Sequence, residues 1–168
     1  RMLVTVGLKS GNPYYTVDYN KNPIVATSHL GFQLDKGILG KDMKITGTRT
    51  DSKDETWQQL WGEDETVRNH YNELAVDLQE KGSKHWMTVV FRVFNDGIGF
   101  RYMIHTLDKG EKYCIQEELT EIALAHDAKA WSIPTNHTEY FEGIYKSALL
   151  SKKDTMCTPV TIEYDKNV

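Results

Sequence analysis

Hydrophobic and polar residues alternate with a period of two along most of the chain. Between residues 2 and 8, for example, Val4, Val6 and Leu8 fall on one side of an extended segment, and residues 15–19 repeat the alternation. Successive side chains of a β-strand point to opposite faces, so this period indicates strands with one face on a core and the other in solvent.

Turn-forming residues separate these alternating segments at the spacing of hairpins. Residues 10–13 read Ser-Gly-Asn-Pro and residues 20–23 read Asn-Lys-Asn-Pro. The clearest pattern is the alternation over 87–94 and again over 98–104, with Asn-Asp-Gly at 95–97 between them. An Asx-Gly turn between two alternating segments predicts a β-hairpin.

The segment 54–81 is rich in Glu, Gln and Leu, and residue propensity alone would favour a helix there. Its apolar positions do not support that choice. Leu74, Val76 and Leu78 keep a period of two, whereas the i, i+3, i+4 stripe of an amphipathic helix is poorly filled. We therefore predict long antiparallel strands in this region.

The whole pattern amounts to about ten short strands, without the regular exchange of strands and helices that marks an α/β fold. It predicts an all-β fold. Loops are expected at residues 125–129 and 136–138. Further strands are expected at residues 113–118, 119–124, 131–133 and 158–164.

Composition and charge narrow the function classes. The chain has 168 residues, 39% of them hydrophobic and 26% charged, which fits one ordinary globular domain over 1–168. The formal net charge is −4 and no segment concentrates Lys or Arg, so nucleic acid is not an expected partner. No apolar run approaches the roughly 18–20 residues of a transmembrane helix, so no membrane span is expected.

The cysteines and histidines show no metal-binding spacing. Cys114 and Cys157 form no CxxC motif, and the expectation is two buried free thiols rather than a disulfide. None of the six histidines lies two or four residues from another, so a preformed imidazole site is not predicted.

Four tryptophans could stack on the apolar faces of sugars, although packing in the core is the favoured interpretation. Trp57 and Trp61 are four residues apart and would share one face of a strand. They lie among Asp54, Glu55 and two glutamines, which leaves partial exposure open.

Several carboxylates could be paired for acid–base chemistry at a glycosidic bond. Spacing alone does not separate catalytic carboxylates from solvated ones, and the solvated interpretation is favoured. Common nucleophile, phosphate-binding and dinucleotide motifs are absent from the sequence. The carboxylates in question are Glu117, Glu118, Glu121, Glu139 and Glu142.

Five groups of residues, in this order, match one known pattern. They are Ser-His-Leu-Gly at 28–31, Asp-Glu-Thr-Trp at 54–57 with Trp-Gly-Glu at 61–63, Arg-Asn-His-Tyr-Asn-Glu-Leu at 68–74, Phe-Arg-Val at 91–93 with Asp-Gly-Ile-Gly-Phe-Arg-Tyr at 96–102, and Ala-Trp-Ser-Ile-Pro at 130–134. Together they resemble the N-terminal domain of glycoside hydrolase family 97, a family of α-glucosidases and α-galactosidases of Gram-negative bacteria.

The resemblance implies a fold and a context. The fold is an antiparallel β-super-sandwich of the galactose-mutarotase-like type, truncated at its C-terminal end. The parent enzyme would add a central (β/α)8 barrel, which holds the catalytic residues, and a C-terminal β-domain. It therefore implies no catalytic residue in this chain, its own barrel domain as partner, an α-linked oligosaccharide as substrate, and a periplasmic or secreted location.

The resemblance also implies a calcium ion in the active site, held mainly by barrel glutamates and by one glutamate of the N-terminal domain. The candidate ligand is Glu139, between Thr138 and Tyr140, and Glu142 is the alternative. Calcium takes roughly six to eight oxygen ligands, so one carboxylate cannot hold it alone.

The rival hypothesis is a free-standing carbohydrate-binding module that binds a glycan with exposed Trp57 and Trp61.

Overall fold

The computed structural model describes residues 1–105, 112–134, 142–153 and 155–164. Its backbone contacts divide the chain into two compact units, Arg1–Ala123 and Leu124–Val168. Every described pairing between strands is antiparallel, and the only helix in the described ranges is one short 3-10 turn. The predicted all-β, antiparallel fold is confirmed.

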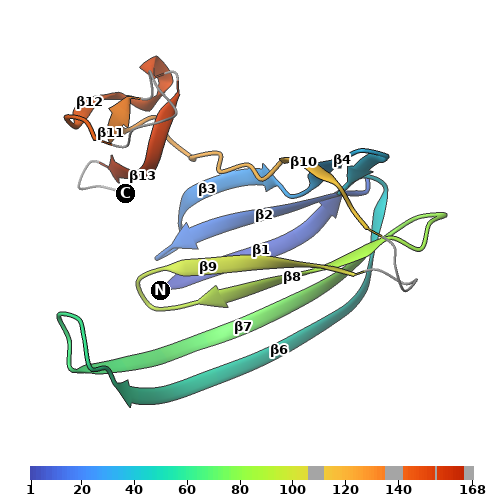
Figure 1. The fold of residues 1–168 in the computed structure, drawn as a ribbon, viewed down its shortest axis with the longest axis horizontal. Coiled ribbons are helices and arrows are strands. Elements are labelled where there is room, and N and C mark those ends of the chain that lie inside the picture. Colours follow the sequence, from blue (N-terminus) through green and yellow to red (C-terminus); the bar gives the residue numbers. More distant parts are fainter. Residues whose placement is uncertain (106–111, 135–141, 154, 165–168) are drawn as a thin grey trace. The chain divides into compact units, whose positions relative to one another are not determined.

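The first unit packs a three-stranded sheet, in the order β1-β2-β3, against a four-stranded sheet, in the order β6-β7-β8-β9 (Figure 1). A small third sheet has the order β10-β4-β5. The strands are β1 (Met2–Lys9), β2 (Asn12–Tyr19), β3 (Asn22–His29), β4 (Phe32–Leu34), β5 (Gly37–Leu39), β6 (Met43–Gln58), β7 (Thr66–Glu80), β8 (Trp86–Val93), β9 (Ile98–His105) and β10 (Ile115–Glu118).

Two-residue turns join β1 to β2 and β2 to β3. Ser10 and Gly11 have φ of 51° and 82°, and Asn20 and Lys21 have φ of 51° and 70°. Left-handed backbone at both central residues is the type I′ geometry, whose twist matches that of the flanking strands. The predicted turns are confirmed, but each is shorter than the sequence suggested because the following Asn-Pro pair already belongs to the next strand.

The other hairpin predictions are also confirmed. Val93 of β8 lies opposite Ile98 of β9, and the N–H of Phe94 donates to the carbonyl of Gly97 at 2.8 Å. Most of the segment 54–81 is strand, from the end of β6 through β7. β7 bonds to β8 only from Asn72 onward, so the part nearer the β6–β7 turn is a two-stranded ribbon.

The segment 119–124 is not a strand, contrary to expectation. It follows the edge of β3, and the N–H of Glu121 donates to the carbonyl of His29 at 2.9 Å. Two side chains replace ladder partners. The Glu121 carboxylate accepts the N–H of His29 at 2.9 Å, and the Ser28 hydroxyl accepts the N–H of Ala123 at 2.9 Å. Because these side-chain hydrogen bonds stand in for backbone pairing, residues 119–124 do not form a regular ladder with β3.

Three aromatic rings join the two larger sheets. The ring of Tyr15, on β2, lies 5.6 Å from that of Phe91 on β8 and 5.5 Å from that of Phe100 on β9. Phe91 and Phe100 are 5.1 Å apart. Around them, Val17, Val76 and other buried residues of both sheets complete the core.

The second unit is a three-stranded sheet in the order β12-β11-β13. The strands predicted at 131–133 and 158–164 are present, as β11 and most of β13. β12 was not predicted, and the loop predicted at 136–138 lies outside the described residues. The elements are β11 (Lys129–Pro134), β12 (Lys146–Leu149), the 3-10 turn η1 (Leu150–Lys152) and β13 (Met156–Glu163).

We expect Phe91→Ala to lower the free energy of unfolding by about 3–5 kcal/mol, because it leaves a cavity at the contact between the sheets. Phe91 has no exposed surface, whereas Leu3 is 58% exposed. Leu3→Ala is therefore the matched control and should change stability little. Urea unfolding followed by far-ultraviolet circular dichroism measures both, and equal effects would contradict this account of the core.

Candidate functional site

The predicted calcium ligand Glu139 lies outside the described residues. The described chain stops at Pro134, the end of β11, and resumes at Glu142, which is exposed. A Cβ added at Gly143 would lie 2.7 Å from Cγ2 of Ile133. The backbone after Glu142 therefore passes against the end of β11, at a distance that suits only glycine.

A buried polar contact through Lys153 connects β12 to β11. Ser132 is fully buried, and its hydroxyl accepts a hydrogen bond from Nζ of Lys153 at 2.7 Å. The same ammonium group donates to the carbonyl of Lys146 at 2.8 Å. One lysine thus bonds to both strands and satisfies a hydroxyl that has no access to water.

Trp131 of β11 lies on the surface of this unit. Its indole N–H donates to the Glu163 carboxylate at 3.1 Å, and the Lys129 ammonium lies 4.4 Å from its ring centroid. The hydrogen bonds from Trp131 and then from Lys129 hold the pKa of Glu163 below its usual value. These contacts fix the indole on the sheet.

The favoured interpretation of the tryptophans as core residues was wrong for Trp131, which is 37% exposed, and for Trp57 and Trp61. Trp57 is 45% exposed and Trp61 is 88% exposed. They do not share a strand face either, because β6 ends at Gln58 and Trp61 lies in the turn toward β7. Leu60, beside Trp61, is almost fully exposed. The ribbon tip thus has an apolar surface.

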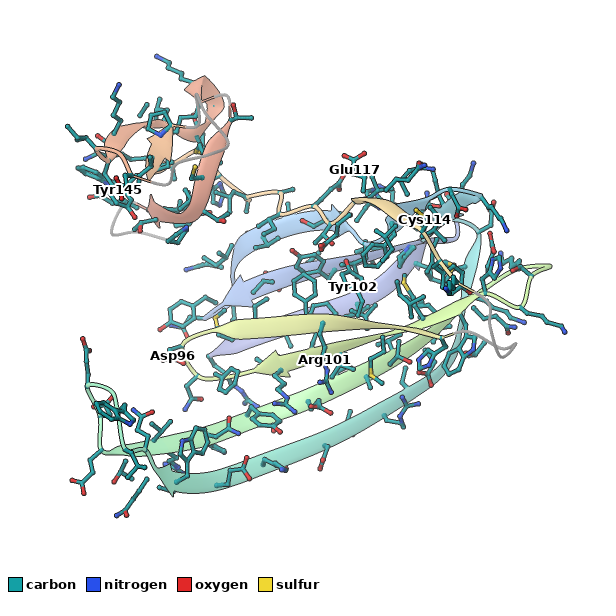
Figure 2. The ribbon with its side chains drawn as sticks, in the orientation of Figure 1. Asp96, Arg101, Tyr102, Cys114, Glu117 and Tyr145 are labelled. Atoms are coloured by element: carbon teal, nitrogen blue, oxygen red, sulfur yellow. The ribbon has the colours of Figure 1, made fainter. Side chains whose placement is uncertain are left out.

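Three of the weighed carboxylates border a shallow groove of about 520 Å³ in the first unit. Glu117, Glu118 and Glu121 are all exposed, which agrees with the solvated interpretation. Glu118 accepts a hydrogen bond from the Thr120 hydroxyl at 2.6 Å, and Glu121 accepts the N–H of His29. Figure 2 shows Glu117 at the outer side of β10. Their described contacts are structural.

Tyr102 adjoins the same segment from the inside of the sandwich (Figure 2). Its hydroxyl lies 2.6 Å from that of Thr120. Burial raises the pKa of Tyr102 to about 12, so this phenol stays protonated at neutral pH. It serves as a hydrogen-bonding group and offers no general base.

Each unit contains one cysteine, and both thiols are free. Cys157 is half-buried, but Cys114 is exposed. The prediction of two buried thiols was therefore wrong for Cys114. It lies just before β10, where a short strand at the rim of a small sheet cannot cover it.

A polar chain that sequence reasoning missed crosses the outer face of the four-stranded sheet. The Thr88 hydroxyl, on β8, donates to the Asp77 carboxylate of β7 at 2.7 Å and lies 2.9 Å from Nε2 of His105 on β9. Arg49 of β6 forms an ion pair with Asp77. Each strand contributes one residue, and no spacing along the sequence reveals that alignment.

This chain of contacts is structural. Thr88 is only 2% exposed, so its hydroxyl cannot reach a substrate as a nucleophile. The indole of Trp86 stacks on His105 with ring centroids 3.6 Å apart. The hydrogen bond from Arg49 holds the pKa of Asp77 below its usual value, and Thr88 acts in the same direction.

The residues at 68–74, which carried part of the resemblance, lie on β7 and pair with neighbouring strands. Arg68 forms a bidentate ion pair with Asp54 of β6 at 2.7 and 2.6 Å. Glu73 accepts a hydrogen bond from Arg92 of β8 at 2.8 Å, and the Arg92 guanidinium lies 4.3 Å from the Tyr71 ring centroid. Their described role is to join strands.

Within the described ranges, no group of three or more His, Cys, Asp or Glu side chains is arranged to hold a metal ion. Nor does that part of the chain contain a helix with the length and apolar composition needed to cross a bilayer.

Comparison with known proteins decides the family. The family model described as "Glycosyl-hydrolase 97 N-terminal" matches residues 1–168. The chain belongs to this family. The resemblance drawn from the sequence is confirmed, and the chain combines a β-sandwich unit with a second, smaller unit built on one three-stranded sheet.

Individual relatives are glycoside hydrolases. A retaining alpha-galactosidase of Bacteroides thetaiotaomicron is 26% identical over 160 residues, which cover 89% of this chain and 23% of that protein. A glycoside hydrolase family 97 enzyme of Pseudoalteromonas sp. strain K8, solved in complex with panose and with acarbose, is 28% identical with a TM-score of 0.90. The match covers 96% of this chain and 25% of that enzyme.

A more distant structure extends the group. A beta-arabinopyranosidase is 25% identical with a TM-score of 0.77, over 86% of this chain and 24% of its own. The chain spans about a quarter of the length of each of these relatives.

Replacing Asp77 with Asn should reveal its lowered pKa as a pH-dependent loss of stability. A lowered folded-state pKa stabilises the fold above the unfolded pKa, about 4 for aspartate, and this contribution disappears as the pH falls through the folded value. Asp77→Asn should therefore be less stable than the natural chain at pH 7, and the difference should shrink toward pH 3. Urea unfolding across this range measures it.

Asp51→Asn is the control, because Asp51 is an exposed carboxylate on β6 that accepts the N–H of Ser52 and forms no ion pair with another described residue. A difference between Asp77→Asn and the natural chain that stays constant from pH 7 to pH 3 would contradict the role assigned to Arg49.

Proposed function

We propose that the chain is the scaffold and active-site-completing N-terminal domain of a calcium-dependent glycoside hydrolase that cleaves α-glucosidic or α-galactosidic bonds. One observation carries the proposal: the family match extends over the whole chain, while the chain spans only a quarter of each enzyme it resembles. Residues 1–168 then belong to one N-terminal domain, and the catalytic groups belong to the barrel of the parent enzyme.

The surface of the described residues supports a scaffold role. Glycosidic hydrolysis needs two carboxyl groups about 5–10 Å apart on either side of a bound sugar. Glu117, Glu118 and Glu121 border an open groove, and two of them are engaged in local hydrogen bonds. Such carboxylates suit neither a general acid nor a nucleophile, so the proposal assigns this chain no catalytic residue.

The connection between β11 and β12 offers calcium the right type of ligand but too few ligands to hold it alone. Glu142 is an exposed carboxylate, the hard oxygen ligand that calcium prefers. A single carboxylate falls short of the roughly six to eight oxygens that calcium takes. Either Glu139 or Glu142 would therefore contribute one ligand to a site completed by the barrel, where the ion would bind substrate oxygens and stabilise negative charge.

The proposal includes the setting that the family resemblance implies. The parent enzyme would act on an α-linked oligosaccharide in the periplasm or outside the cell. The relatives support a carbohydrate substrate, since one is an alpha-galactosidase and another was solved with panose and acarbose.

A second candidate function rests on the ribbon tip. Because Trp57 and Trp61 are exposed, they could stack on sugar rings without any barrel, as in a free-standing carbohydrate-binding module. The tip is carried by two strands only, so no third strand stands beside the exposed indoles to complete a binding face. The scaffold role is therefore the better supported of the two.

Calcium dependence separates the two candidate ligands. In the parent enzyme, Glu139→Ala should weaken calcium binding and lower hydrolysis of an aryl α-glycoside, with partial rescue at high calcium, because it removes one of several ligands. Glu142→Ala is the matched control. Titration of EDTA-treated enzyme with calcium measures both, and loss with Glu142→Ala alone would transfer the role to Glu142.

The isolated chain should neither hydrolyse aryl α-glucosides or α-galactosides nor bind panose measurably. Calorimetric titration with panose tests the second point, since a binding module acts unaided whereas a scaffold does not. Saturable heat that is lost in Trp61→Ala but kept in Trp131→Ala would favour the binding module. Hydrolysis by the purified chain that a point mutation abolishes would overturn the scaffold role.

A further inference from the structure

The free edge of β1 is unusually well formed for pairing. β1 is the terminal strand of its sheet and pairs with β2 alone among the described strands (Figure 1). The N–H of Asn20 donates to the carbonyl of Arg1 at 3.0 Å. Backbone groups of an antiparallel strand point alternately to its two edges. The residues whose backbone groups face away from β2 are therefore Met2, Val4, Val6 and Leu8.

The opposite edge of the same sheet is covered. Beyond β3, the backbone of 119–123 exchanges hydrogen bonds with residues 26, 29 and 31 at 2.7–2.9 Å. Exposed strand edges are usually blunted in this way, or by proline, bulges or charges, because they template pairing with other chains. β1 has no proline, no register shift against β2 and no charge before Lys9.

The space beside β1 is bounded by the larger sheet. Thr48, Thr50 and Ser52 of β6 lie opposite Val76, Leu74 and Asn72 of β7. Side chains directly opposite each other in a sheet share a face. These three β6 residues therefore continue the face on which the core is built, yet all three are exposed. The three-stranded sheet ends before it covers them.

Two adjoining hollows occupy this space. One, of about 610 Å³, is lined by Val4 together with Thr50, Ser52 and Leu74. The other, of about 840 Å³, runs along the first residues of β1. Val4, Asn72 and Val93 line both, so the hollows form one groove beside β1.

We propose that this groove is a strand-docking site, in which an extended segment from another part of the parent polypeptide pairs with the free edge of β1 and covers the inner face of β6. Neighbouring strands lie about 4.7–4.9 Å apart, and packed sheets lie about 10 Å apart. A strand added beside β1 at that spacing lies over β6. Its alternate side chains face Thr50, Ser52 and Leu74, so the fitting segment has small or apolar residues at every second position.

The occupant is a segment of the same polypeptide rather than a second copy of this chain. The framework recurs with a TM-score of 0.90 in an enzyme of which it forms 25%. The remaining length offers strands at the high effective concentration of a covalent link. The choice of this occupant rests on the proposed function in one respect, that the chain is one domain of a longer enzyme.

Amide hydrogen exchange tests the proposal directly. In the 168-residue chain, the amides of Val4 and Val6 should exchange fast, while that of Thr5, which is bonded to β2, is protected. In the parent polypeptide, Val4 and Val6 should become protected by at least about tenfold. Protection that appears in the 168-residue chain and rises with its concentration would identify a second copy and overturn the proposal.

Thr50→Lys sharpens the test, because it places a long cation in the groove without touching the packed core. Its melting temperature in the 168-residue chain should match the natural one, whereas in the parent polypeptide the protection of Val4 and Val6 should be lost. Thr56→Lys, on the same face of β6 but outside the groove lining, should leave that protection intact.

Fast exchange of Val4 and Val6 in a parent polypeptide that hydrolyses α-glycosides would overturn strand docking and leave the proposed function standing. Protection of Val4 and Val6 in a parent polypeptide that does not hydrolyse α-glycosides would overturn the proposed function and leave strand docking standing.

Discussion

The contact between the two larger sheets, made by Tyr15, Phe91 and Phe100, is the interaction on which the first unit depends. Burial of apolar surface is the main favourable term in folding, and here it is concentrated where β2 crosses β8 and β9. Neither sheet can bury its apolar face alone. The Tyr15 hydroxyl also donates to the carbonyl of Glu121 at 2.9 Å, so the same side chain that packs the core secures the segment along β3.

On the outer face of the four-stranded sheet, hydrogen bonds and an ion pair between polar side chains connect the strands. Arg49, Asp77, Thr88 and His105 bring one polar side chain from each strand into a connected row. No buried side-chain nitrogen or oxygen among the described residues lacks a hydrogen-bond partner, in keeping with the high cost of leaving such groups unsatisfied. The sheet thus has an apolar side that fixes its packing and a polar side that ties its strands together.

Periodicity predicted the long elements and failed on the short ones. The alternation at Val4, Val6 and Leu8, and at Leu74, Val76 and Leu78, correctly placed β1 and β7 because eight or more residues give the period room to appear. β4 and β5 have three residues each, too few for any period. The segment 119–124 was predicted as a strand, but the side chains of Ser28 and Glu121 take over some of its hydrogen bonds, which no pattern of apolar positions reports.

The candidate site was less accessible to sequence reasoning. Glu139 came from family resemblance alone, since a metal ligand shared between domains leaves no spacing within one of them. The row from Arg49 to His105 escaped notice for a related reason: bonded partners in it are between 11 and 28 residues apart in sequence and meet only through strand register. Trp57 and Trp61 were expected in the core by composition, but the ribbon that carries them has no third strand to cover it.

That ribbon has a spectroscopic consequence. The buried core of the first unit contains tyrosine and phenylalanine but no tryptophan, whereas Trp57 and Trp61 lie at the exposed end of β6 and in the adjoining turn. Indole fluorescence from these two residues reports on the water around the ribbon tip and is nearly blind to the packing between the sheets. Even with the core intact, these two indoles would emit like those of a partly unfolded chain, and they would shift toward shorter wavelengths on contact with another domain or a sugar.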